Sequence, residues 1–579
     1  MATFRRDAVD RIEIDNAGER ILLPLKEGRW TITEPIEDFA DADLIGDILD
    51  RLGDLHPMRK TSIQPADTSQ QTLDLTEYGL EPSRQKVILK GRDMAEVAIH
   101  FGVHTTNQSS VYAMLKGSGE LSLVDRAVKE LLFNEPDTFR DPYVTRILPS
   151  DFSEIHIKQT DREIKLNLAG GDWFFESPLQ ARADSQKVYD QLALITSLKI
   201  LNFLSGDLAA SASADLAAPK GTISLTGLIN GQKQELVIHL GNEVKGVPDA
   251  LYASISGRHD FCAVPKAAAA ILNAAPNELR SRKLAKIQPE ELKKVVIENS
   301  PAQPQSDPRI ELVKIGKGWY LGGDKKAPAQ QSEVYRFLQR LDENEVLEFV
   351  SDAATDFSPY GLEAPRTTAS FFREDPASRR AKGSGTELQL ALKIAFGNTQ
   401  KDQIYVRTND SPFVFLVKNS LHSDIFKTMY QWRTLLIQAR NPEEIRSIHI
   451  SHTGKAPLDI SRAEADRKWK SDDPARPISP DYAESLARSI AALRALRWAD
   501  PKISRQECGL DQAEFSLSFL LADEDVPRTI SIGKEALDGR YASFSLEPAI
   551  FILSKPTCEV LNIPIELQGK TSSAEQESQ

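Results

Sequence analysis

The sequence is poor in cysteine, and this excludes two kinds of stabilised fold. Among 579 residues there are three cysteines, Cys262, Cys508 and Cys558. Their number is odd and no two of them form a CxxC pair. Neither a dense disulfide framework nor a cysteine-type zinc site is therefore expected.

Long hydrophobic segments are also missing. No window approaches the roughly 20 apolar residues of a membrane span. Residues 1–8 contain two arginines but no apolar core of a signal peptide. As written, the chain is expected to be soluble.

Positive charge is in deficit. The chain has 71 Lys and Arg against 84 Asp and Glu, a formal net charge of -13. A nucleic-acid binder needs a net positive face to release counterions from phosphates, so nucleic acid is excluded as a partner. A polybasic membrane-surface protein is disfavoured for a similar reason.

Known catalytic motifs are missing as well. The sequence has no HExxH, GxSxG, Walker phosphate loop, or GxGxxG after a strand. The carboxylates between Asp41 and Asp50 fit a solvated helix face better than an acid/base pair, which needs two carboxyls in one cleft. We predict that the protein is not an enzyme and has no catalytic, cofactor-binding or metal-binding residues. A hydrolase would require a site assembled from separate parts of the chain.

What the chain does have is a pattern that recurs four times. Each copy opens with two alternating apolar stretches, which predict a half-buried hairpin, followed by a tryptophan. These residues are Trp30, Trp173, Trp319 and Trp469, spaced by 143, 146 and 150 residues. We expect them to cover the hairpin in the core rather than to stack on carbohydrate. Trp432 and Trp498 lie outside this position and are better candidates for surface residues.

A helix is predicted after each tryptophan, because apolar residues recur at helical spacing behind a residue that can cap the first turn. The predicted caps are Asp41, Asp184, Ser332 and Asp481. The small-residue stretch 209–219 of the second copy is predicted to be a loop.

Two glycine signatures and a tyrosine follow. Three copies carry a glycine before a leucine, predicted to supply a positive φ in a tight turn: Gly79, Gly361 and Gly509. The second copy has Ala214-Asp215-Leu216 roughly in that place. All four copies then end a strand in glycine, at Gly102, Gly241, Gly397 and Gly533, and a tyrosine follows, at Tyr112, Tyr252, Tyr405 and Tyr541.

An arginine closes three of the copies: Arg140, Arg280 and Arg433. An arginine here could bind an anion, but bracing the junction to the next copy is the simpler role. The fourth copy lacks it and runs into a polar tail.

One copy therefore reads β-β-α-β-β-β-β-α, which predicts an α+β fold of four tandem modules. Strand runs with hairpin connections imply antiparallel sheets with helices packed on one face. The predicted modules are 1–149, 150–290, 291–443 and 444–569, and residues 570–579 are expected to be a disordered tail. The sequence leaves open whether the modules form a rod or a compact shape.

The ordered recurrence of these motifs resembles the bacterial domain-of-unknown-function 4340 (DUF4340) proteins. The matching residues include Trp30, Ala40-Asp41, Tyr78-Gly79-Leu80 and Phe139-Arg140-Asp141. The resemblance implies a membrane-anchored protein with one N-terminal transmembrane helix and a large extracytoplasmic domain, encoded with ABC transporter components and gliding-motility-type auxiliary proteins. It implies no enzymatic activity. The N-terminal helix is missing here, and its removal is the favoured explanation, because Met1 lies only a few residues before the first strand.

Two functional hypotheses follow. The first is a non-enzymatic accessory scaffold of an ABC-type export or motility-linked membrane complex, anchored on the periplasmic side. It would bind permease or auxiliary subunits through grooves between modules and exposed sheet edges. The alternative is a multivalent extracellular glycan- or peptide-binding protein, which gains avidity from four similar modules. The sequence identifies neither the partner nor the oligomeric state.

Overall fold

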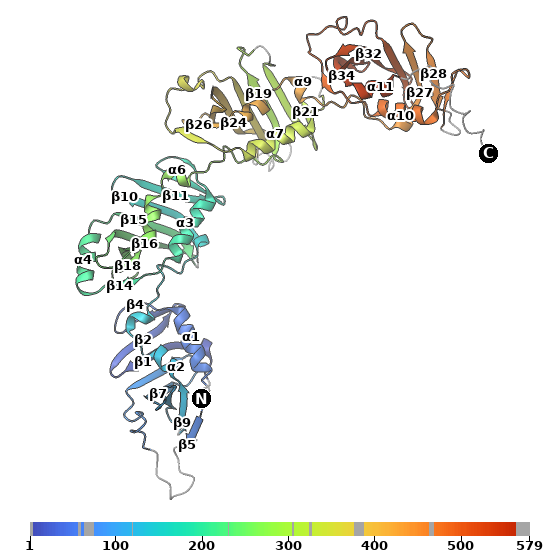
Figure 1. Cartoon of the computed structure of the whole chain (residues 1–579). Coiled ribbons are helices and arrows are strands. Elements are labelled where there is room, and N and C mark those ends of the chain that lie inside the picture. Colours follow the sequence, from blue (N-terminus) through green and yellow to red (C-terminus); the bar gives the residue numbers. More distant parts are fainter. Residues whose placement is uncertain are drawn as a thin grey trace, which may run out of the picture. The chain divides into compact units, whose positions relative to one another are not determined.

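The computed structural model describes residues 4–55, 59–62, 74–118, 120–229, 231–303, 306–322, 327–375, 387–462 and 468–562. The tail predicted at 570–579 lies outside these ranges. The chain divides into two compact units, Met1–Ser281 and Arg282–Gln579. Each unit contains two antiparallel sheets (Figure 1), and we call the four sheet-bearing segments modules 1 to 4. Within the described ranges, no helix combines the length and apolar character needed to cross a membrane.

Module 1 has the sheet order β4-β3-β2-β1-β6-β7-β8-β9-β5. Its elements are β1 (Val9–Asn16), β2 (Glu19–Lys26), β3 (Arg29–Ile32), β4 (Asp38–Phe39), α1 (Ala42–Gly53), β5 (Arg59–Ser62), β6 (Gln85–Gly91), β7 (Val97–His104), β8 (Ser110–Leu115), β9 (Glu120–Asp125) and α2 (Arg126–Leu132).

Module 2 repeats this order as β13-β12-β11-β10-β15-β16-β17-β18-β14. Its elements are β10 (Phe152–Gln159), β11 (Glu163–Ala169), β12 (Asp172–Ser177), β13 (Ala181–Arg182), α3 (Ser185–Ser197), β14 (Asn202–Phe203), α4 (Gly206–Leu216), β15 (Gly221–Ile229), β16 (Gln232–Glu243), β17 (Ala250–Ile255), β18 (Cys262–Pro265), α5 (Ala269–Asn273) and α6 (Pro276–Leu279).

Module 3 has the order β21-β20-β19-β23-β24-β25-β26-β22. Its elements are β19 (Leu292–Asn299), β20 (Arg309–Ile315), β21 (Gly318–Leu321), α7 (Gln331–Glu343), β22 (Glu348–Ser351), β23 (Thr367–Glu374), β24 (Leu388–Gln400), β25 (Gln403–Thr408), β26 (Val414–Lys418), α8 (Ser420–Ile425) and α9 (Met429–Trp432).

Module 4 has the order β29-β28-β27-β31-β32-β33-β34-β30. Its elements are β27 (Ile445–His452), β28 (Leu458–Arg462), β29 (Trp469–Ser471), α10 (Pro480–Ala491), β30 (Arg497–Trp498), β31 (Phe515–Leu521), β32 (Arg528–Ala536), β33 (Gly539–Phe544), β34 (Glu547–Ser554) and α11 (Lys555–Leu561).

The order of strands differs from the predicted β-β-α-β-β-β-β-α at two places that all four modules share, and modules 1 and 2 have a further short strand before the main helix, β4 or β13. The segment that carries the tryptophan is itself a third strand, because it pairs with β2, β11, β20 or β28. A short strand after the main helix, one of β5, β14, β22 and β30, pairs with the last strand of its sheet. These strands are too short for alternation to reveal them in the sequence.

The helix starts are partly as predicted. Asp41 and Asp184 are N-caps whose side chains accept backbone N–H groups of the first turn. In α7 and α10 the N-cap positions are occupied by Gln330 and Ser479, two residues before the predicted Ser332 and Asp481. Neither side chain makes a capping hydrogen bond. The predicted loop at 209–219 is largely helix α4, because its alanines and leucines favour helix and Ala212 packs in a small apolar cluster.

Each sheet has one main core, on the face that its main helix covers, as Figure 1 shows for α7 and α10. The prediction of helices on one face is wrong for α4 of module 2, which packs with Tyr252 and Ala263 on the opposite face of its sheet. In three modules the main and closing helices pack against each other: α1 with α2, α7 with α8, and α10 with α11. Val144, Leu284 and Ile287, which the predicted boundaries assign to the preceding module, belong to the core of the following one. The predicted domain limits otherwise remain a prediction.

The two glycine signatures meet at one contact. Gly79, Gly361 and Gly509 adopt φ of 66°, 67° and 68°, the left-handed conformation predicted for the turn. A Cβ on Gly102, Gly397 or Gly533 would collide with the carbonyl oxygen of the residue before that turn glycine. The N–H after the strand glycine donates to this same oxygen in two modules, Val103 to Tyr78 (3.0 Å) and Lys534 to Cys508 (2.9 Å). Only glycine lets the turn approach the strand so closely.

Module 2 makes the same contact with a side chain. A Cβ on Gly241 would collide with the Asp215 carboxylate of α4. Asn242 donates its N–H to that carboxylate (2.7 Å), as Val103 does to the turn carbonyl in module 1. A carboxylate therefore replaces the backbone oxygen where the Gly-Leu turn is missing.

The signature tyrosines pack beside this contact. The rings of Tyr78 and Tyr112 lie 4.7 Å apart, and those of Tyr360 and Tyr405 lie 5.2 Å apart. Tyr252 and Tyr541 belong to the corresponding small clusters of modules 2 and 4. Tyr405 alternates with core residues of β25, so this cluster lies on the face of the sheet opposite the helices.

We expect Gly102→Ala to destabilise module 1 by about 2 kcal/mol or more, since the added methyl overlaps a backbone oxygen that cannot move without breaking the turn. Hydrogen–deuterium exchange of the peptides covering β7 and residues 74–80 measures the effect. Gly53→Ala is the matched control, because its Cβ would meet only the Phe4 ring at 4.0 Å. Equal exchange in the two variants would contradict the close-contact explanation.

His422 on α8 gives module 3 a pH-dependent stability. Its Nε2 lies 3.1 Å from the hydroxyl of Thr367, and its ring stacks with Phe426 at 5.3 Å. Burial lowers the pKa of His422 to about 4, with a smaller contribution from the Arg366 cation. The unfolded chain, with a histidine pKa near 6.5, therefore takes up a proton at higher pH than the folded one.

Module 3 should consequently be fully stable above about pH 6.5 and lose about 3 kcal/mol as the pH falls toward about 4. Hydrogen–deuterium exchange of β23 and α8 peptides from pH 7 to pH 4 measures this loss. His422→Gln should remove most of the dependence while keeping a polar partner for Thr367. A wild-type profile that the substitution does not flatten would refute the role of His422.

Candidate functional site

The groups that usually carry chemistry are separated or occupied. No group of three or more His, Cys, Asp or Glu residues that could hold a metal occurs among the described residues. The three cysteines are buried, and burial raises the pKa of Cys262 to about 12 and that of Cys558 to about 11. Thiols with such pKa values are poor nucleophiles.

Histidines on the first strands of modules 2 and 4, and the carboxylates around α1, take part in surface pairs. His156 lies 2.7 Å from Glu163, and His449 lies 2.7 Å from Asp459, each across neighbouring strands. The α1 carboxylates pair with arginines, in the pairs Arg6–Asp50, Arg51–Asp47, Arg146–Asp43 and Arg146–Asp41. These contacts are typical of solvated sheet and helix faces.

The tryptophans are core residues. Trp173 and Trp319 are fully buried, Trp469 is 3% exposed, and Trp30 packs partly buried against the core of module 1. All four lie in the third strand of their modules. Trp432 and Trp498, predicted to be better surface candidates, are also buried. Trp432 fills the core of module 3 beside Phe337, and Trp498 lies under an arginine, as described below.

The tryptophan strand and the closing arginine, distant in sequence, are joined by a backbone bridge that we call the clasp. It pairs Ala40 with Arg140, Ala183 with Arg280 and Ala329 with Arg433. In each case the alanine N–H also donates to the tryptophan carbonyl, at 3.0, 2.8 and 2.9 Å. The helix N-cap follows the alanine directly, so the clasp ties the start of the main helix to the point where the chain leaves the module.

Two further hydrogen bonds complete each clasp. In module 1, Asp41 donates its N–H to the Phe139 carbonyl (2.8 Å) and Asp141 donates to Phe39 (2.9 Å). The equivalent bonds run from Asp184 to Leu279, Ser281 to Arg182, Gln330 to Trp432 and Thr434 to Pro328. The clasp therefore fixes the backbone of the closing arginine in three modules.

In unit 1, the side chain of Arg140 reaches module 2. Its Nε donates to Asp38 (2.6 Å) of its own module and its Nη1 to Asp260 (3.0 Å) of module 2. Its guanidinium lies 3.5 Å from the ring centre of Phe203 on β14. Arg258, from the same module 2 turn as Asp260, donates to Asp38 (3.2 Å). The side chains of Arg140, Arg258 and Asp38 are at most 2% exposed.

Arg258 also holds the chain that connects the modules. Its Nη2 donates to the carbonyls of Asp141 (2.8 Å) and Tyr143 (2.6 Å), the residues that follow the clasp. The sequence analysis did not predict roles for Asp38, Arg258 or Asp260, because positions whose residue differs between copies carry no repeat signal.

In unit 2, Arg433 makes the corresponding contacts with module 4. It forms a bidentate ion pair with Glu547 at the start of β34, with an Nη1–Oε1 distance of 3.0 Å. Its guanidinium lies 4.4 Å from the ring centre of Trp498 on β30. Phe203 and Trp498 occupy the same short strand of their modules, so the closing arginine meets an aromatic ring and a carboxylate in both units.

Beside Arg433 lies a groove of about 790 Å³, which we call the joint groove. Module 3 contributes the start of α7 and the segment around α9, and module 4 contributes residues 496–502. The groove combines apolar side chains with charged ones, as protein-binding surfaces commonly do.

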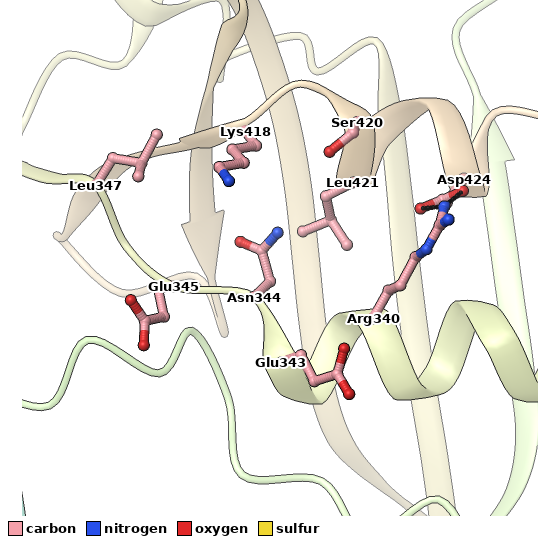
Figure 2. A pocket seen from close by; sticks show the side chains of 9 residues that line it. All are labelled: Arg340, Glu343, Asn344, Glu345, Leu347, Lys418, Ser420, Leu421 and Asp424. Carbon is pink, nitrogen blue, oxygen red and sulfur yellow. Dashed lines mark hydrogen bonds and ion pairs between the residues drawn. The ribbon is translucent and has the colours of Figure 1, made fainter.

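A second hollow lies within module 3, between the end of α7 and the start of α8, with a volume of about 440 Å³. Figure 2 shows Arg340 of α7 extended toward Asp424 of α8 at one end of it, and they form a salt bridge of 2.6 Å. Asn344, Glu345 and Leu347 line it from the segment after α7. This hollow contains no residue of the repeat signature, whereas the joint groove contains Arg433, and we therefore take the joint groove as the candidate site.

Removing the carboxylate at the junction of modules 1 and 2 should be costly. Asp38→Asn leaves Arg140 and Arg258 buried without their shared counter-charge, so we expect a loss of about 3–5 kcal/mol in local stability. Hydrogen–deuterium exchange of residues 138–146 and 256–262 measures it. Asp47→Asn, which removes an exposed helical pair with Arg51, should cost less than about 0.5 kcal/mol. Similar effects of the two substitutions would show that the buried ions do not hold the junction.

Comparison with known proteins gives one family and no individual relative. A family model described as a domain of unknown function, DUF4340, matches residues 30–219, 173–365 and 319–513. Each match begins at a signature tryptophan and extends past the clasp into the next module. Together the matches cover most of the chain. No curated protein and no solved structure matches.

Proposed function

The chain belongs to the DUF4340 family, and from this membership we propose that it is a non-enzymatic scaffold that binds partner proteins at the surfaces between its modules. The observation that carries the proposal is the repeated junction, in which a clasped arginine of one module meets an aromatic ring and a carboxylate of the next. Such a junction fixes the position of one module's surface relative to that of the next module within the same unit. The joint groove is one such surface.

The proposed setting is an ABC-type export or motility-linked membrane complex. This part of the proposal rests on what the family resemblance implies. Permease or auxiliary subunits are the proposed partners, on the extracytoplasmic side, and the natural full-length protein would be held there by an N-terminal membrane anchor.

Glycan binding finds less support than protein binding. Stacking on sugars requires exposed aromatic faces, yet Trp173, Trp319, Trp432, Trp469 and Trp498 are at most 8% exposed. The joint groove, with its apolar and charged side chains, suits a peptide better.

The test is affinity purification of the natural full-length protein, cross-linked in intact cells and extracted from membranes with detergent. We expect permease or auxiliary subunits to co-purify with the wild-type protein. The combined variant Arg433→Ala, Glu547→Ala should recover less of them, because it loosens the junction beside the groove. The control Arg51→Ala, Asp47→Ala removes an exposed pair within one helix and should recover as much as wild type. Failure to recover any membrane subunit with the wild-type protein would refute the scaffold proposal.

A further inference from the structure

Module 4 has the helix start of a clasp without, among the described residues, the segment that pairs with it. Ile478 directly precedes Ser479, the N-cap of α10, so it stands where the clasp alanine stands in modules 1 to 3. In those modules the N–H of the N-cap residue donates to a carbonyl of the closing segment. Neither Ile478 nor Ser479 donates its N–H to an oxygen of the described residues. We call residues 477–479 the fourth clasp position.

Apolar surface accompanies these two donors. Phe139, Leu279 and Trp432, which directly precede the closing arginines, belong to the cores of modules 1, 2 and 3. The core of module 4 has no residue that follows α11, as far as the structure describes the chain. Ile478 and Tyr482, at the start of α10, pack against this core only partly buried. The fourth clasp position therefore suits a segment that brings backbone acceptors and one large apolar side chain.

The sequence contains a segment of this kind. Modules 1 and 2 close with the pattern Pro-x-x-apolar-Arg, at residues 136–140 and 276–280, and module 3 has Met429 in place of the proline. The pattern returns after α11 at residues 564–568, which lie outside the described ranges. Leu567 takes the apolar position there, and a glutamine replaces the arginine. The fourth copy therefore retains the closing pattern in all but its last residue.

The spacing of this segment also matches the other modules. The apolar residue comes six or seven residues after the end of the closing helix, which is α2, α5 or α8. Leu567 comes six residues after α11 ends at Leu561. The closing helix packs against the main helix in module 4 (α11 with α10) as it does in modules 1 and 3. A segment of the same length therefore reaches the same place.

We propose that residues 564–568 close module 4 as its clasp. The Ser479 N–H donates to the Leu567 carbonyl, and the Leu567 side chain covers the apolar surface at the start of α10. Ile478 faces Gln568 across the backbone bridge. Gln568 carries no charge, whereas the arginine at this position in modules 1 and 3 reaches a carboxylate of the next module. This clasp therefore fixes module 4 without supplying the cation that joins modules, whether or not the chain acts as the proposed scaffold.

Disulfide trapping in the full chain tests the pairing. The hydrogen bonds of a clasp flank its bridged pair, and in such an antiparallel pair the Cα atoms lie about 4.5 Å apart, a distance that a disulfide spans. The double variant Ile478→Cys, Gln568→Cys should therefore form an intramolecular disulfide on mild oxidation, identified by mass spectrometry as one linked pair of peptides. The three native cysteines are buried, so they compete little.

A displaced pair provides the control for trapping. The variant Ile478→Cys, Ile565→Cys moves the second thiol three residues along the chain, and its yield of intramolecular disulfide should be about tenfold lower, because the geometry of a disulfide is narrow. Equal yields from the two variants overturn the proposal. Disulfide-linked dimers in place of the intramolecular link also overturn it, since they would show that a second copy fills the fourth clasp position.

A charge at the apolar position tests the packing. Leu567→Asp should raise the hydrogen–deuterium exchange rate of residues 477–486 about tenfold, because burial of an unpaired carboxylate opposes closure of the clasp. Ile565→Asp is the matched control: it places the same charge at the position that corresponds to Asp137, whose side chain is 61% exposed, and should leave the rate unchanged. Residues 329–338 of module 3 should exchange alike in both variants. Equal rates for residues 477–486 in the two variants overturn the proposal.

Discussion

The clasp is the constraint on which the repeated architecture depends. In modules 1 to 3, a single backbone bridge joins the alanine before the main helix to the arginine where the chain leaves the module. It supplies partners for the N–H group of the helix cap and for the carbonyl that precedes the arginine. Unpaired backbone groups in such a buried place would be costly, so the geometry of this bridge is closely defined. The direction of the arginine side chain, and with it the junction to the next module, follows from that geometry.

The two junctions described within the units use this fixed arginine in different surroundings. Around Arg140, two guanidinium groups share the buried carboxylate of Asp38, whereas Arg433 meets Glu547 in a bidentate pair that is 14–20% exposed. Buried ions are weak evidence of net stability, because desolvation opposes their attraction. They do define one arrangement, since a displaced module would leave charges without partners. This favours a role in holding surfaces in register over a role in raising stability.

The sequence predicted the parts of the fold that a single residue type must satisfy. The structural role of the glycines could be predicted, because a positive φ or a close backbone contact excludes nearly every other residue type. These glycines are Gly79, Gly102, Gly361, Gly397, Gly509 and Gly533. The importance of the tryptophans and arginines could be predicted because each recurs at the same position of successive modules. Asp38, Arg258, Asp260 and Glu547 could not be predicted, since several positions near a junction can supply a charge and the copies use different ones. The tryptophan strand was missed because a strand of three to six residues shows too little alternation.

The clasp also has a consequence for how the chain folds as it is made. The clasp pairs Ala40 with Arg140, Ala183 with Arg280 and Ala329 with Arg433, so none of modules 1 to 3 can close until almost all of it has left the ribosome. Such long-range closure is slow compared with helix formation. During synthesis the N–H group of each of these helix caps has no clasp partner until the closing segment of its module has been made. The junction forms only once Arg258 and Asp260, or Trp498 and Glu547, of the next module have also been made. The modules should therefore mature one after another from the N-terminal end, each finished module presenting a fixed arginine to the one still emerging.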